Sequence, residues 1–217
     1  MTFKLSPSSL GLMKECPRCF WLTKHKIWKR PSGAFPSLPS GIDRILKTHF
    51  DKFMKKGELP PELRENGLAK GVKLFENEEL LKTWRNNLKG IEWHDKKGNI
   101  LRGAVDNVLS RGKKLIVLDY KTKGYPVKEN DHEYYQHQID IYNFLLRKNG
   151  YATEDYSYLL FYVPSEVMET GEIVFDTELR KIKTDVGNAE RLFSGALKLL
   201  NGRCPKKSCE WCEGVKR

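Results

Sequence analysis

Two acidic residues and a lysine lie near the ends of two neighbouring apolar segments. Asp119 and Lys121 close the segment KLIVLDYK, and Asp106 lies in the preceding segment GAVDNVL. Residues i and i+2 of a strand point to the same face, so we expect Asp119 and Lys121 to project together. If the two segments pair through the turn at SRGKK, Asp106 lies near Asp119. Two carboxylates beside an amine form a site for a hard dication such as Mg²⁺ or Mn²⁺, with the lysine close to an attacking water.

An acid-x-lysine triplet is also common as a plain surface ion pair. That alternative has weight here, because charged residues make up 31% of the chain. Two features favour a site. The segment before Asp119 is apolar enough to be buried on both faces, and a second acid lies on the neighbouring segment.

The five cysteines form two groups near opposite ends of the sequence. The segment CPRC contains Cys16 and Cys19, and the segment CPKKSCEWC contains Cys204, Cys209 and Cys212. Two Cys-x-x-Cys pairs can bring four thiolates onto one metal, so Cys16, Cys19, Cys209 and Cys212 suit tetrahedral zinc or an iron–sulfur cluster. Reduced, buried thiols without metal are the alternative. Either kind of metal centre would join the two ends of the domain.

The composition indicates one basic domain of 217 residues with a net charge of +11. This charge favours a polyanionic partner, because lysine and arginine displace counterions from phosphates. A basic protein without a nucleic-acid partner is the alternative. No apolar run approaches the roughly 20 residues that cross a membrane, and the N-terminal segment lacks the features of a secretory signal. We therefore expect a cytoplasmic protein without disulfides.

The apolar pattern predicts helices before and after a group of strands. Ser6 and Pro7 predict a helix start, residues 29–41 a loop, and Gly57 the end of a helix that begins at Ile42. Strands are expected over residues 90–94, 100–110, 114–121, 156–164 and 172–184, and later helices over residues 132–149 and 185–201. A helix between the third and fourth strands predicts a mixed sheet, and hence an α/β or α+β fold.

The order and spacing of these motifs resemble the core of the PD-(D/E)xK nuclease superfamily. The segment GAVDNVLSRGKKLIVLDYKTK matches a Gly-x-x-Asp strand followed by an apolar strand that ends in Asp-x-Lys. The segment QHQIDIY matches the Gln-x-x-x-Tyr motif of the RecB-like branch, which includes the nuclease domains of RecB and AddB and the CRISPR adaptation exonucleases. The N-terminal segment SPSSLGLMKECPRCFWL resembles the start of that branch, so the resemblance spans nearly the whole chain.

The resemblance implies a restriction-endonuclease-like α/β fold, in which helices flank a mixed central sheet and a cysteine cluster joins the N- and C-terminal ends. We expect a single nuclease domain over residues 1–217. Its parts are an N-terminal helical region (1–89), a catalytic core (90–182) and a C-terminal helix with the cysteine tail (183–217).

The resemblance also implies roles for single residues. Asp106 and Asp119 would bind the divalent metal, and Lys121 would be the catalytic lysine. Gln138 and Tyr142 would contact the DNA backbone or support the site.

Members of the family often carry a metal-binding histidine in an early helix, a few residues after a glycine. In this chain Ile45 occupies the usual position after Gly41, and His49 follows one turn later. His49 is therefore the expected third ligand, with Asp43 and Asp51 as alternatives.

Several RecB-like nucleases hold a 4Fe–4S cluster with one early cysteine and three C-terminal ones. Cys16, Cys204, Cys209 and Cys212 fit that division, but the order of spacings in the tail differs from the common pattern. All five cysteines, including Cys19, are thus candidate ligands of a 4Fe–4S cluster or of Zn²⁺.

The expected function is a metal-dependent deoxyribonuclease in which water attacks a phosphodiester. The branch favours exonucleases acting on single-stranded DNA or the ends of duplexes, in DNA repair, recombination or CRISPR-type processing. A non-catalytic nucleic-acid-binding module on the same fold is the alternative, and the intact acidic pair with its lysine argues against it. A basic, metal-stapled protein without a nucleic-acid role is a third interpretation.

Overall fold

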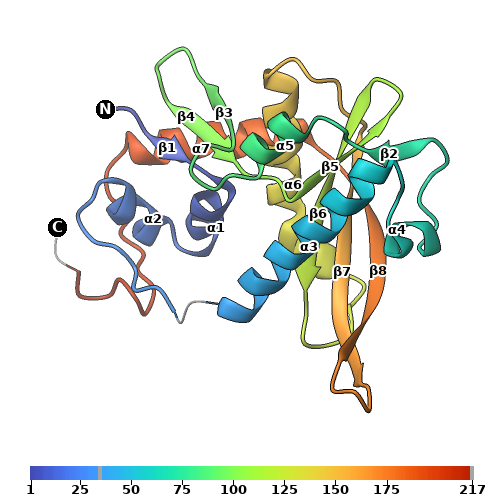
Figure 1. Cartoon of the computed structure of the whole chain (residues 1–217). Helices are drawn as coiled ribbons and strands as arrows, with labels where there is room; N and C mark the ends of the chain where they lie inside the picture. Colours follow the sequence, from blue (N-terminus) through green and yellow to red (C-terminus); the bar gives the residue numbers. More distant parts are fainter. Residues whose placement is uncertain (34–35, 216–217) are drawn as a thin grey trace.

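The computed structural model describes residues 1–33 and 36–215 (Figure 1). Residues 34–35 of the expected loop and residues 216–217 of the expected cysteine tail lie outside this range. Helices flank two mixed sheets, which confirms the expected α/β architecture. No described helix has both the length and the apolar character needed to cross a membrane.

The larger sheet carries the candidate chemistry in its central strand. Its order is β2 (Val72–Leu74), β5 (Asn107–Arg111), β6 (Lys114–Thr122), β7 (Tyr156–Val167) and β8 (Ile173–Lys183). β6 and β7 are parallel and the other neighbours are antiparallel, as expected for two strands joined by a helix. The apolar run from Leu115 to Leu118 is buried because helices cover both faces of this sheet.

The smaller sheet contains β1 (Lys4–Leu5), β4 (Ile100–Gly103) and β3 (Ile91–His94), with β4 in the middle. The prediction of one strand over residues 100–110 is therefore wrong. The chain leaves the small sheet after Gly103 and enters the large sheet at Asn107. Two hydrogen bonds hold the backbone of the crossing: the N–H of Val105 donates to the Trp84 carbonyl at 3.2 Å, and the side-chain Nε of Arg85 donates to the Asp106 carbonyl at 2.7 Å.

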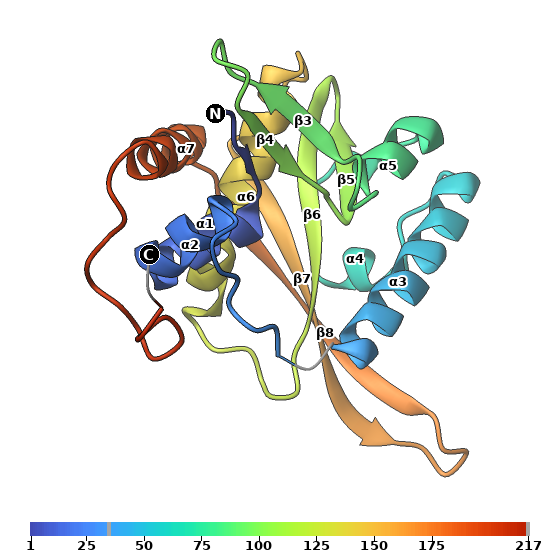
Figure 2. The ribbon, with the colours of Figure 1, turned by 90° about the vertical axis from the view of Figure 1, so that its left-hand side faces the viewer.

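The helices form a layer on each side of the large sheet (Figure 2). One side holds α1 (Pro7–Glu15), α2 (Pro17–Lys24), α6 (Asp131–Lys148) and α7 (Val186–Leu200). The other side holds α3 (Ser37–Lys56), α4 (Pro61–Glu65) and α5 (Glu78–Trp84). The N-terminal helices and the C-terminal tail lie side by side on the first side, although they are distant in sequence.

Local capping explains where the first helices begin and end. Ser6 is the N-cap of α1, as predicted, and its side chain accepts from the Ser9 N–H, while Gly57 ends α3 with φ at +69°. The start predicted for α3 is wrong, because the helix begins at Ser37, inside the expected loop. Its first turn contains Pro39, whose fixed φ suits a helix start and which needs no backbone donor there.

A buried carboxylate fixes α6 against α7. Asp140 is fully buried and accepts hydrogen bonds from Gln136 Nε2 at 2.8 Å, the Asp185 N–H at 2.8 Å and Asn188 Nδ2 at 2.7 Å. Residues two apart on a helix point to nearly opposite sides. Anchoring Asp140 towards α7 therefore turns Gln138 towards β6.

The close approach of α6 to β4 requires a glycine at position 103. A Cβ atom added to Gly103 would lie 2.7 Å from Cε1 of Tyr142 and 3.1 Å from Cδ1 of Leu145. We expect Gly103→Ala to lower the free energy of unfolding by about 1–3 kcal/mol, because overpacking must push the ring of Tyr142 away. Urea unfolding followed by circular dichroism will measure this change.

Gly195→Ala is the matched control for this prediction. Gly195 lies exposed on α7, and an added Cβ there meets no atom within 4 Å. Alanine favours the helix at such a site by roughly 0.5–1 kcal/mol. Equal unfolding free energies for Gly103→Ala and the wild type would contradict the packing argument.

Candidate functional site

The end of β6 presents a buried acid and a lysine on the same face. Asp119 has no exposed surface, and its Oδ2 lies 2.5 Å from Lys121 Nζ. The lysine stem is largely covered, and its Nζ lies 4.5 Å from the centre of the Tyr135 ring. This ion pair is therefore enclosed by protein and differs from a solvated surface pair.

Asp106 joins this group from the crossing between the two sheets. Asn107 pairs with Leu118, so Asp106 stands opposite Asp119 in register. The N–H of Tyr120 donates to Asp106 Oδ2 at 3.0 Å, and Lys47 Nζ on α3 lies 3.2 Å from Asp106 Oδ1. Because the strand is broken here, Asp106 lies just before the first residue of β5, and its carboxylate is partly exposed.

Gln138 and Tyr142, one turn apart on α6, contact the acid and the lysine. Gln138 Oε1 accepts from Lys121 Nζ at 3.2 Å, while its Nε2 donates to Asp119 Oδ1 at 3.3 Å and to Tyr142 Oη at 2.7 Å. The side-chain amide thus bridges the two charged groups. We call these contacting residues the acidic cluster. The β4–β5 crossing supplies Asp106, β6 supplies Asp119 and Lys121, α6 supplies Gln138 and Tyr142, and α3 supplies Lys47.

The charges of the cluster perturb one another. Burial raises the pKa of Asp119 well above its ordinary range; Lys121 opposes this rise and Asp106 adds to it. Burial disfavours the charged form of Lys121, but Asp119 and Asp106 outweigh burial and raise its pKa. The cluster is rich in desolvated negative charge, which a bound cation would stabilise.

The donor set fits a hard divalent cation. Asp119 Oδ2 is buried and faces the Lys121 ammonium, whose Nζ lies 2.5 Å away. A buried carboxylate oxygen of this kind is normally satisfied by a donor or a metal. Asp106 Oδ1, which lies 3.2 Å from Lys47 Nζ, is the second oxygen that could bind a metal, and carboxylate oxygens are the ligands that Mg²⁺ and Mn²⁺ prefer.

His49 lies in a different group of contacts. Its Nε2 lies 2.9 Å from Glu62 Oε1, an oxygen that also accepts from Tyr162 Oη at 2.8 Å. The helical phase explains this position. Lys47 faces Asp106, and a residue two positions later points about 200° away around the helix.

The face of α3 that approaches the acids carries the two alternatives to His49. Asp43 Oδ2 lies 2.7 Å from Lys47 Nζ, the same amine that contacts Asp106. Asp51 Oδ1 accepts from Arg85 Nη1 at 2.6 Å, and Arg85 holds the Asp106 carbonyl. Lys47 and Arg85 were not identified from the sequence. For Lys47, its spacing of four residues from Asp43 could have indicated an ion pair on one helix face.

An open cleft of about 770 Å³ lies next to the cluster. α1 contributes Lys14, β4 contributes Arg102, and α6 contributes Tyr134, Tyr135 and Gln138. A second cleft of about 330 Å³ opens on the α3 side, where Asp43 and Lys121 line it. The cluster is thus accessible from solvent along cationic and aromatic side chains.

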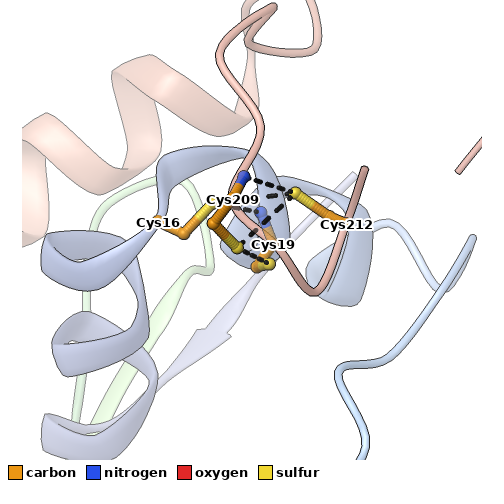
Figure 3. A group of neighbouring side chains, drawn as sticks. All are labelled: Cys16, Cys19, Cys209 and Cys212. Carbon is orange, nitrogen blue, oxygen red and sulfur yellow. Dashed lines mark hydrogen bonds between the residues drawn. The ribbon is translucent and has the colours of Figure 1, made fainter. Parts of the chain in front are cut away.

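The four cysteines of the two Cys-x-x-Cys pairs come together at the junction of α2 and the C-terminal tail (Figure 3). Their sulfur atoms all lie within 4.8 Å of one another, so Cys16, Cys19, Cys209 and Cys212 could hold a metal. Cys204, the fifth expected ligand, lies outside this group. Its Sγ accepts from Arg18 Nη1 at 3.5 Å.

One protein family matches nearly the whole chain. The family model of the PD-(D/E)XK nuclease superfamily matches residues 4–214. No match to a curated protein was found. Among solved structures, the crystal structure of SSO0001 is similar at 16% sequence identity, with a TM-score of 0.44 and coverage of 98% of this chain and 84% of that chain.

Proposed function

Because this chain belongs to the PD-(D/E)XK nuclease superfamily, we propose that it is a Mg²⁺- or Mn²⁺-dependent DNA exonuclease of the RecB-like branch. The superfamily acts on nucleic acids by hydrolysing phosphodiester bonds with the help of divalent metals. The main support for the proposal is that Asp106, Asp119, Lys121 and Gln138 meet where β5 begins and β6 ends. In this proposal residues 1–217 form one nuclease domain with the three parts expected from the sequence.

Asp106 and Asp119 are the proposed metal ligands. Together these two carboxylates would hold a divalent ion, which would supply positive charge to a water nucleophile and to the phosphate. The raised pKa of Asp119 supports this role, because a desolvated carboxylate is stabilised by an adjacent cation. Asp43 is the alternative third ligand that the geometry favours over His49, since Asp43 shares Lys47 with Asp106.

Lys121 is the proposed catalytic lysine. An ammonium group has three donors, and Gln138 Oε1 accepts one of them. With Asp119 beside it, at least one donor remains to orient the attacking water or to contact a phosphate oxygen. Gln138 and Tyr142 are proposed positioning residues, because the Gln138 amide hydrogen-bonds both the Asp119 carboxylate and the Lys121 ammonium and is itself bonded to Tyr142 Oη.

The 770 Å³ cleft is the proposed path of the DNA strand. Lys14 and Arg102 offer positive charge for phosphates, and Tyr134 and Tyr135 offer ring faces for bases. This combination is how proteins bind single strands without strong sequence preference. It favours a single strand, or the frayed end of a duplex, as substrate in DNA repair, recombination or CRISPR-type processing.

Cleavage assays on defined DNA will test the proposal. We expect the wild type with Mn²⁺ or Mg²⁺ to degrade end-labelled linear single strands and to leave closed circular single strands intact. Replacing Lys121 by methionine keeps the stem but removes the charge, and we expect at least about a hundredfold slower cleavage. RNA of the same sequence will report whether the substrate is DNA.

Lys114→Met is the matched control, because Lys114 lies at the other end of β6 in an exposed pair with Glu154. We expect it to cleave like the wild type. Tight, salt-sensitive DNA binding without cleavage would instead support the non-catalytic binding module. Cutting of closed circles would exclude a strict exonuclease.

A further inference from the structure

The distances between the four sulfur atoms distinguish one metal ion from a cluster. Cys16 Sγ lies 3.8 Å from Cys212 Sγ, Cys19 Sγ lies 3.5 Å from Cys209 Sγ, and Cys209 Sγ lies 3.8 Å from Cys212 Sγ. No pair among the four exceeds 4.8 Å. Figure 3 shows the sulfur atoms turned towards one another from α2 and the tail.

A tetrahedral ion and an iron–sulfur cluster need different spacings. With a metal–sulfur distance of 2.3 Å, the four sulfurs of a tetrahedral zinc site lie about 3.8 Å apart. In a 4Fe–4S cluster each thiolate binds a different iron, which moves the four sulfurs to roughly 6 Å from one another. We propose that Cys16, Cys19, Cys209 and Cys212 hold a single tetrahedral Zn²⁺ and that this chain carries no iron–sulfur cluster.

The position of Cys204 supports this assignment. The cluster expected from the family division needs Cys204 as a ligand and leaves Cys19 out. In the structure Cys19 is fully buried inside the group, whereas Cys204 contacts Arg18 and the Pro205 carbonyl. The ligand set therefore consists of two Cys-x-x-Cys pairs, the usual arrangement of structural zinc sites.

The surroundings of the four sulfurs suit thiolates. Four thiolates with one Zn²⁺ carry a net charge of −2, which needs nearby donors. Arg30 Nη2 lies 3.6 Å from Cys209 Sγ and 3.8 Å from Cys19 Sγ. Within each pair a backbone N–H donates to a sulfur at 3.4 Å, from Cys19 to Cys16 and from Cys209 to Cys212.

Elemental and sulfide analysis of anaerobically purified full-length protein will test the assignment independently of any nuclease activity. We expect about one zinc per chain, no acid-labile sulfide and no visible absorption. Cys204→Ser should keep the zinc, and Cys209→Ser should lose it. About four irons and four sulfides per chain, lost in Cys204→Ser, would overturn the proposal, as would one iron in place of zinc.

Cobalt substitution covers the case in which Cys209→Ser does not fold. We expect Co²⁺ added to the metal-stripped wild type to give the intense visible bands of a tetrahedral thiolate complex, and zinc to displace it. The same spectrum from Cys204→Ser would confirm that the fifth cysteine is not a ligand. Bands of an octahedral cobalt complex would contradict the tetrahedral site.

Discussion

Replacing Asp119 by asparagine will slow DNA cleavage by at least about a thousandfold while the protein remains folded. Asparagine keeps the size of the side chain and an oxygen that can accept from Gln138 Nε2. It removes the buried negative charge that pairs with Lys121 and that we propose binds the metal. Single-turnover cleavage of labelled DNA will measure the rate, and Mn²⁺ binding by calorimetry will show the loss of affinity.

Asp155→Asn is the matched control for this change. Asp155 pairs with Arg147 through a side chain that is 83% exposed. The same substitution there should leave both cleavage and Mn²⁺ binding at wild-type values. Wild-type cleavage by Asp119→Asn, with the fold confirmed by circular dichroism, would exclude Asp119 as a metal ligand and with it the proposed mechanism.

Loss of the metal that we propose for the cysteine centre will lower the melting temperature by about 10 °C. Metal binding contributes directly to folding when the ligands come together only in the folded state. A ligand present at a thousand times its dissociation constant stabilises by about 4 kcal/mol, and each kcal/mol shifts the melting temperature of a domain this size by about 2–4 °C. Thermal melts of wild type, Cys209→Ser and chelator-treated protein will measure the shift.

Cys204→Ser serves as the control in these melts, because its sulfur lies outside the group of four. We expect it to melt within about 2 °C of the wild type, because serine nearly keeps the size of this partly buried side chain and no metal ligand is lost. Equal melting temperatures for Cys209→Ser and the wild type would show that metal binding at the four cysteines does not stabilise the fold.

The sequence predicts well those features that depend on local periodicity. The apolar run before Asp119 predicts β6, and the pattern from His132 to Gly150 predicts α6 to within about one residue. The i, i+2 rule of strands predicts the approach of Lys121 to Asp119, and hairpin pairing predicts the position of Asp106.

Features that depend on packing between distant segments were not predictable in this way. The break between β4 and β5 follows Gly103, which α6 approaches so closely that an added Cβ would overlap Tyr142, and no local pattern reveals such an approach. The direction of His49 depends on how α3 is rotated against the sheet, which the helical period alone does not fix. The separation of Cys204 from the other cysteines likewise depends on the path of the tail.

The joined ends impose an order on biosynthesis. Cys16 and Cys212 are 196 residues apart, so a ribosome finishes nearly all of the described chain before this pair of ligands can meet. α1 forms one wall of the 770 Å³ cleft and is followed directly by α2, which carries Cys19. Nascent chains would therefore keep an unanchored cleft wall until translation has passed the second cysteine pair.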